Sequence, residues 1–145
     1  MSTLGNIASW VTAKLISDVS YLNARNVFAI AEPEEFREVA LNRPAVGVIV
    51  KPAGNYGNQT PPRTDYVRLV VEVWFSAERF RSDTTEGLST TEGIYEMFDD
   101  ITAALQGETP TSADQPLLYG SGGLAEVDEG LVTAYVEYET AVLLV

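Results

Sequence analysis

The sequence predicts one domain in which helices and strands follow one another along the chain. Apolar residues recur at helical spacing in residues 4–22, 33–41 and 94–105. Between these segments, short apolar runs and strictly alternating stretches indicate strands. The chain has 145 residues, of which 46% are hydrophobic, so it can bury a core within a single domain, residues 1–145.

The N-terminal part is expected to hold a helix, a strand and a second helix. Residues 4–22 form the first helix because their apolar groups gather on one side. These groups are Ile7, Trp10, Val11, Ile16 and Val19. Residues 27–31 read as a short apolar strand. In the second helix, 33–41, Pro33 suits the first helical position and the acids after it suit the helix dipole.

Two strands follow, separated by a long loop. Residues 44–50 are apolar on both faces, which is typical of an interior strand. The segment 51–64 is rich in Gly, Pro and Asn, and loops of this length are usually functional or disordered. The clearest strand is 65–75, whose apolar face is Val67, Leu69, Val71, Val73 and Phe75. Its other face is amphipathic and could meet a helix or a neighbouring subunit.

The third helix carries the strongest local signals. Ser89-Thr90-Thr91-Glu92 matches a capping box, with Ser89 as the N-cap. The apolar stripe that follows is Ile94, Met97, Phe98, Ile101 and Leu105, and Gly107 is expected to end the helix. After a loop at 108–116, a strand begins at Leu117. Gly120-Ser121-Gly122-Gly123 interrupts it, which indicates a bulge or a bend.

The last strand, 131–145, follows a turn at Asp128-Glu129-Gly130 and is unusually long. Fifteen residues at ~3.4 Å each would extend ~50 Å, whereas a compact domain of this size is ~38 Å across. The strand must therefore bend, break or protrude. Its apolar end must be covered either by the core of the domain or by another subunit.

Charge divides the chain into two parts. From Ser82 to Val145 the sequence holds 13 carboxylates and no Lys or Arg, and the net charge of the whole chain is −12. Such a surface repels nucleic acid and anionic lipid, so we expect neither specific nucleic-acid binding nor membrane binding. It can instead be matched by a partner, or by another copy that presents the basic part.

The sequence holds no signature of catalysis. It has no His and no Cys, which excludes Ser-His-Asp and Cys-His chemistry and disfavours transition-metal sites. The acidic pairs Asp99-Asp100 and Asp128-Glu129 do not lie in a calcium-loop pattern. The glycines at 120–123 lack the Lys-Ser/Thr of a phosphate-binding loop. We therefore expect a protein that is not an enzyme and that has no metal, cofactor or catalytic residue.

The order of elements resembles the tail terminator proteins of long-tailed bacteriophages, the lambda U-like and Mu-type neck proteins. The resemblance covers nearly the whole chain and rests on a pattern of elements and apolar positions. The matching segments are the N-terminal helix, Pro44-Ala45-Val46-Gly47-Val48, the long loop, the strand from Val67 to Val73, the helix from Ile94 to Leu105, Pro116-Leu117, and the strand from Thr133 to Glu139.

This resemblance implies an α+β fold, a single domain with an antiparallel or mixed sheet packed against two or three helices. It implies a homohexameric ring that caps the head-proximal end of the tail tube and stops tube polymerisation. The implied partners are other copies, the tube protein, the head-tail connector or stopper protein and, in a contractile tail, the sheath protein. The implied location is the neck region of the virion, after assembly in the host cytoplasm. The family has no catalytic residues.

Within such a ring, the charged residues suggest an interface. Acidic residues expected to face the lumen or a subunit boundary are Glu92, Glu96, Asp99, Asp100, Asp128 and Glu129. Basic residues that could meet the acidic part of an adjacent copy are Lys51, Arg63, Arg68, Arg79 and Arg81. A carboxylate-lined lumen would repel the passing DNA, although salt screens this repulsion beyond ~8 Å.

Two other functions fit the same sequence. The chain could be another neck or baseplate adaptor of the same particle. It could also be an acidic inhibitor or immunity protein that mimics nucleic acid, in which case a tight complex of one monomer with a basic enzyme is expected.

Overall fold

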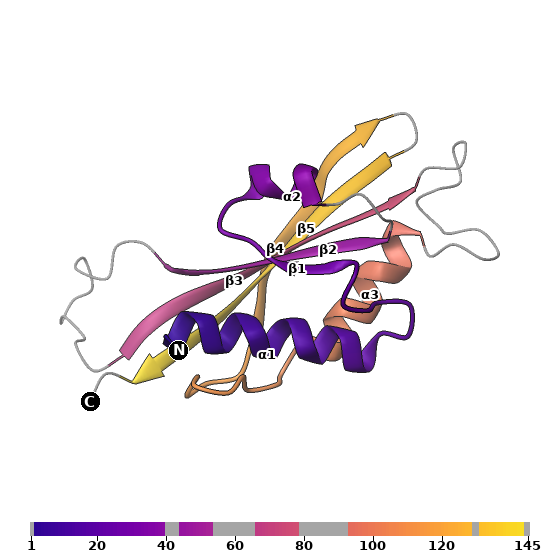
Figure 1. Cartoon of the computed structure of the whole chain (residues 1–145). Coiled ribbons are helices and arrows are strands. Elements are labelled where there is room, and N and C mark those ends of the chain that lie inside the picture. The colour runs from indigo at the N-terminus through magenta and orange to yellow at the C-terminus, as the bar shows by residue number, and fades with distance from the viewer. Residues whose placement is uncertain (1, 40–43, 54–65, 79–92, 129–130, 144–145) are drawn as a thin grey trace.

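The computed structural model describes residues 2–39, 44–53, 66–78, 93–128 and 131–143, and it confirms the α+β fold (Figure 1). The helices in this part of the chain are α1 (Thr3–Asp18), α2 (Pro33–Val39) and α3 (Ile94–Leu105). The strands are β1 (Val27–Ala29), β2 (Ala45–Pro52), β3 (Tyr66–Glu78), β4 (Leu118–Asp128) and β5 (Leu131–Leu143).

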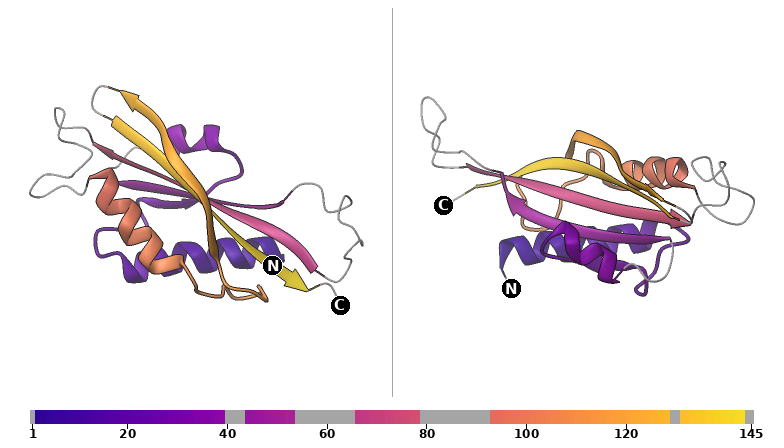
Figure 2. Two further views of the ribbon diagram at one scale, coloured as in Figure 1. Left: turned by 180° about the vertical axis from the view of Figure 1, so that it is seen from behind. Right: turned by 90° about the horizontal axis from the view of Figure 1, so that it is seen from above.

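The described strands form one mixed sheet in the order β1-β2-β3-β5-β4. Strand β1 runs parallel to β2, and each of the other neighbouring pairs is antiparallel. Strand β2 is interior, as its apolar faces predicted. Strands β1 and β4 are the two edges, and Figure 2 shows β4 along one margin of the twisted sheet with α3 beside it.

One face of the sheet, which we call the core face, carries the main hydrophobic core. Helices α1 and α3 contact each other and pack on this face, below the strands in Figure 1. The helices contribute Ile7, Val11, Leu15, Ile94, Met97, Ile101 and Leu105. The strands contribute Val46, Val48, Val71, Val73, Phe75, Val136 and Tyr138. The period-two face predicted for β3 and the helical stripe predicted for α3 are therefore confirmed.

The opposite face, which we call the outer face, is covered by α2 at one end. Phe36 of α2 packs with Ala45, Ile30 and Trp74. Gly47 allows this approach, because a Cβ at that position would lie 2.7 Å from Ile30 and 2.8 Å from Phe36. A helix of the same chain thus meets part of the amphipathic face of β3.

The structure shows how the long last strand is covered, for which the sequence left two alternatives, the core of the domain or another subunit. Strand β5 lies inside the sheet, paired with β3 from Leu131 to Leu143 and with β4 up to Glu139. Beyond Glu139, β5 no longer pairs with β4, and the loop before β4 covers this edge of β5 instead. Asp114 donates its backbone N–H to the Ala141 carbonyl (2.9 Å) and accepts the Leu143 N–H at its carboxylate (2.6 Å). The domain itself therefore buries Val132, Val136, Tyr138 and Ala141, which is one of the two alternatives expected, whereas Leu143 is 38% exposed and its coverage by another subunit stays a prediction.

The predicted helix ends were partly wrong. Helix α3 begins at Ile94 with Gly93 as its N-cap, so Ser89 is not the cap, and the Ser89–Glu92 motif lies outside the described residues. The other end agrees, since Gly107 has φ +82°, the left-handed conformation that favours glycine after a helix. Helix α1 begins one residue before the predicted start, because the Ser2 hydroxyl caps it by accepting the Gly5 N–H at 3.1 Å.

The glycine-rich segment of β4 contains the predicted irregularity. The register with β5 shifts between Tyr119 and Ser121, and again between Leu124 and Glu126. Gly122 lies where the two strands approach closely, because a Cβ there would be 2.9 Å from the Tyr135 carbonyl oxygen. A Cβ at Gly123 would meet nothing nearer than 3.9 Å.

Gly122→Ala should lower the free energy of unfolding by about 1–3 kcal/mol, because the methyl group forces the β4 and β5 backbones apart. Gly123→Ala is the matched control, since it restricts the unfolded chain equally and adds a methyl group in open space. Urea denaturation of both variants measures the difference. Equal stabilities would show that β4 and β5 can accommodate a methyl group at Gly122 without moving apart.

Candidate functional site

An apolar groove of about 240 Å³ lies between α3 and β4 at the edge of the sheet. The groove is lined by residues of α3, β3, β4 and β5. The lining residues are Phe75, Ile94, Tyr95, Phe98, Tyr119, Gly122, Gly123, Leu124, Ala134 and Tyr135. Three of these side chains are about half exposed: Tyr95 (53%), Leu124 (50%) and Tyr119 (46%). Exposed apolar side chains that gather in one groove indicate a binding surface rather than the scattered exposure of an ordinary surface.

The groove is held open by a chain of aromatic contacts. Phe98 of α3 meets Tyr119 of β4 edge to face, with ring centroids 6.2 Å apart. Tyr119 in turn meets Tyr138 of β5 edge to face at 6.4 Å. Tyr138 is fully buried and shares a hydrogen bond of 3.0 Å with the Thr102 hydroxyl of α3. The floor of the groove therefore forms with the core and does not need a ligand to order it.

The strand that borders the groove has an unpaired edge. Among the described strands, β4 has only β5 as a neighbour. Its first outward N–H, that of Tyr119, donates to the side-chain oxygen of Gln106 at 2.7 Å. Residues 120–125 are exposed. Unpaired strand edges attract other chains, so this edge and the groove beside it form one candidate interaction surface.

The predicted acidic surface lies partly beside this groove. Asp99 does not line the groove, but it follows the lining residue Tyr95 by one helical turn, on the same side of α3, and is exposed. Asp100 is exposed too, but it accepts a hydrogen bond of 2.7 Å from the Tyr21 hydroxyl. Glu96 is half-buried, and its Oε2 has no hydrogen-bond partner in the described part of the chain. Asp128 ends β4, whereas Glu92 and Glu129 lie outside the described residues.

Two of the predicted basic residues form ion pairs within the chain, on the outer face. Lys51 lies 2.8 Å from the Glu72 carboxylate, and Arg68 lies 2.5 Å from that of Glu139. Arg63, Arg79 and Arg81 lie outside the described residues. That these cations meet an adjacent copy stays a prediction, but Lys51 and Arg68 already have partners of their own.

Glu72 is the most buried of these charged groups. Its side chain is 5% exposed, and it accepts the indole N–H of Trp74 as well as the Lys51 ammonium. The hydrogen bond to Glu72 raises the pKa of Lys51 above its ordinary value of 10.5. Glu137 lies directly across from Glu72 on β5, so two like charges face each other and Lys51 offsets their repulsion.

The described residues show neither a metal-binding cluster nor a helix that could span a membrane. They contain no cluster of three or more Asp and Glu side chains that could hold a metal ion. None of the helices described is long and apolar enough to cross a bilayer. The groove and the strand edge beside it offer a partner apolar contacts and backbone hydrogen bonds.

Neither comparison with known proteins found a relative: no family model matches the chain, and no curated protein matches it. The function must therefore be inferred from the fold, the charge and the geometry of the groove.

The sequence did not predict the groove. Tyr95, Tyr119 and Leu124 come from two elements whose packing depends on the order of the strands, and periodicity does not encode that order. One signal was present: Tyr95 lies off the apolar stripe of α3, and a large aromatic residue at an outward position indicates a contact surface.

Lys51→Met should lower the free energy of unfolding by roughly 1–3 kcal/mol, because it leaves the buried Glu72 carboxylate without its cation and opposite Glu137. Arg68→Met is the matched control. It removes a pair that is about half exposed on both sides (52% and 47%) and should cost less than about 1 kcal/mol. Chemical denaturation at pH 7 compares them, and equal losses would mean that burial of Glu72 contributes nothing.

Tyr138 should make the protein sensitive to alkali. Burial raises the pKa of its hydroxyl from 10.0 to about 12, so the folded state keeps a proton that the unfolded state releases. Stability from this group is complete below pH 10 and falls as the pH rises to 12, by about 2–3 kcal/mol. Tyr138→Phe should show a smaller loss over this range in denaturation curves. Parallel curves for the two proteins would contradict the assignment.

Proposed function

We propose that this chain is a tail terminator of a long-tailed phage or phage-like particle. In this role it forms a ring that caps the head-proximal end of the tail tube and joins it to the connector or stopper protein. In a contractile tail the ring also contacts the sheath. The observation that carries the proposal is an apolar groove beside β4, whose outer edge pairs with no other described strand.

The fold supports the proposal through the order of its elements. A long helix, a short strand, a short helix, two strands, a third helix and a final hairpin follow one another as in the family that the sequence resembles. The two longest paired strands, β3 and β5, give the domain a rigid centre. A ring component needs such a centre, because it must present defined surfaces to its neighbours and to the tube.

Charge supports a channel for DNA. The net charge of −12 and the exposed Asp99 and Asp100 give the chain a surface that phosphates avoid. Such a surface offers no counterion release to DNA, so DNA could pass through the ring without being held. The same surface is compatible with an inhibitor that mimics nucleic acid, which the experiment must distinguish.

The decisive experiment polymerises the tail tube protein of the same particle with and without this chain. A terminator should give tubes of uniform length that carry a ring at one end, and electron microscopy measures both features. Leu124→Glu, which places a charge in the groove, should reduce capping by an order of magnitude or more. Ala103→Glu is the control, because it adds the same charge at an exposed position of α3 outside the groove.

Three results would overturn the proposal. Unchanged tube lengths would exclude a terminator. Binding only at the opposite end of the tube would favour a baseplate adaptor. A protein that stays monomeric and forms a tight one-to-one complex with a basic enzyme would favour the inhibitor.

A further inference from the structure

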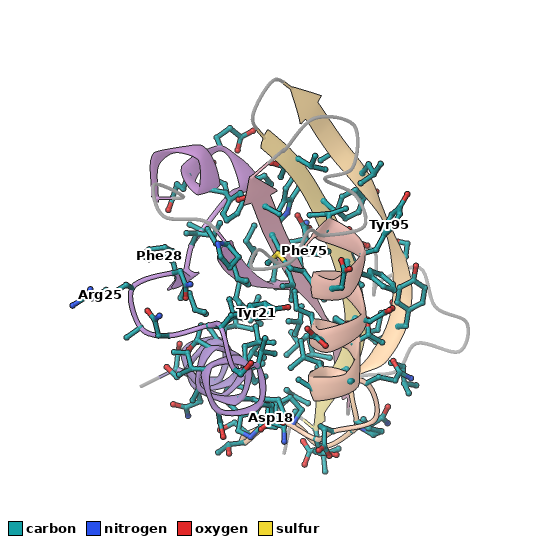
Figure 3. The ribbon with its side chains drawn as sticks, turned by 90° about the vertical axis from the view of Figure 1, so that its right-hand side faces the viewer. Asp18, Tyr21, Arg25, Phe28, Phe75 and Tyr95 are labelled. Carbon is teal, nitrogen blue, oxygen red and sulfur yellow. The ribbon has the colours of Figure 1, made fainter. Side chains whose placement is uncertain are left out.

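The two margins of the sheet carry opposite chemistry. The β4 margin has the groove, with the half-exposed rings of Tyr95 and Tyr119 and the carboxylate of Asp99 beside them. The β1 margin has the turn of residues 23–26, which precedes β1, contains Arg25 and is closed by the Asn26 N–H donating to the Asn23 carbonyl at 3.1 Å. Figure 3 shows Arg25 and Phe28 on one side of the molecule and Tyr95 on the other.

Arg25 differs from the other described cations. Of the four basic side chains described, Lys14, Lys51 and Arg68 each form an ion pair within the chain. Arg25 forms none with the residues that the structure describes, it is exposed, and it points away from the body of the protein in Figure 3. In a chain with a net charge of −12, a cation without a carboxylate partner is available to another molecule.

The groove offers the partners that a guanidinium prefers. A guanidinium stacks on the faces of tyrosine rings and pairs with carboxylates, and arginine and tyrosine are enriched at the centres of protein interfaces. Tyr95 and Asp99 lie one turn apart on the same side of α3, so one guanidinium can reach both. From Ser82 onward the sequence has no Lys or Arg, and none of the described residues that line the groove is a cation.

We propose that the groove between α3 and β4 binds the Arg25 turn of a second copy of this chain. The contact rests on the proposed function, because it is the head-to-tail contact that such a ring needs. The two patches differ and lie at opposite sides of the protomer, so each copy can bind one neighbour on each side and the assembly can close. A contact between two identical patches would stop at a dimer.

Cross-linking tests the contact directly, because the chain contains no cysteine. Ala24→Cys places a thiol beside Arg25, and Leu124→Cys places one in the groove. With a short bis-maleimide linker, the double variant should give a ladder of dimers, trimers and larger species at high protein concentration. Each single variant should give no ladder. A dimer from Leu124→Cys alone would show that two grooves face each other, and the absence of any ladder would overturn the proposal.

A charge variant provides a second test that does not depend on linker geometry. Arg25→Glu should weaken self-association on the order of tenfold, measured by sedimentation over a range of protein concentrations. Ala13→Glu, on the exposed side of α1, also makes the chain more acidic and should leave the association unchanged. Asp99→Arg should restore association to the Arg25→Glu variant. Equal weakening by Arg25→Glu and Ala13→Glu would mean that net charge alone matters.

The outcomes for the contact and for the function are separable. Tube capping without a ladder would overturn this contact and leave the terminator function standing. A ladder from a chain that does not arrest tube growth would leave the contact standing and overturn the terminator function.

Discussion

The antiparallel pairing of β3 with β5 is the constraint on which the other features depend. It runs unbroken from Tyr66–Leu143 to Glu78–Leu131 and joins two strands that are distant in the sequence. Because β5 takes this interior place, β4 is left at the edge of the sheet with one free side. The groove, the exposed edge and the position of α3 beside it all follow from that arrangement.

The groove keeps its shape because its supports are buried. Tyr138 binds Thr102 and the ring of Tyr119 rests against it, so the position of β4 relative to α3 is fixed from inside the core. Gly122 lets β4 approach β5 closely at the point where the strand bends. A surface that is formed in advance loses little conformational entropy on binding, which favours assembly through a small contact.

Sequence reasoning succeeded where the signal was local. The alternation in β3, the stripe of α3, the stop at Gly107 and the irregularity at Gly120 to Gly123 all depend on residues close together in the chain. It failed at the start of α3, where a capping box was matched but Gly93 caps the helix. It also could not place the long final strand, because the partner that shelters β5 is set by strand order. Tyr95 and Leu124 line one groove because strand order brings α3 and β4 together, so no short sequence pattern predicts the groove.

Ion pairing within the chain limits how copies can attract one another. Lys51 pairs with Glu72 and Arg68 pairs with Glu139, so the charges of these two cations are already balanced by carboxylates of the same chain. Two copies that each carry −12 therefore repel one another at a distance, and salt reduces this repulsion beyond ~8 Å. Attraction at short range can come from burial of apolar rings and from Arg25, which has no ion-pair partner among the described residues. We expect such a protein to associate weakly in dilute solution and to need a surface that gathers the copies, which the end of a tail tube would provide in the proposed role.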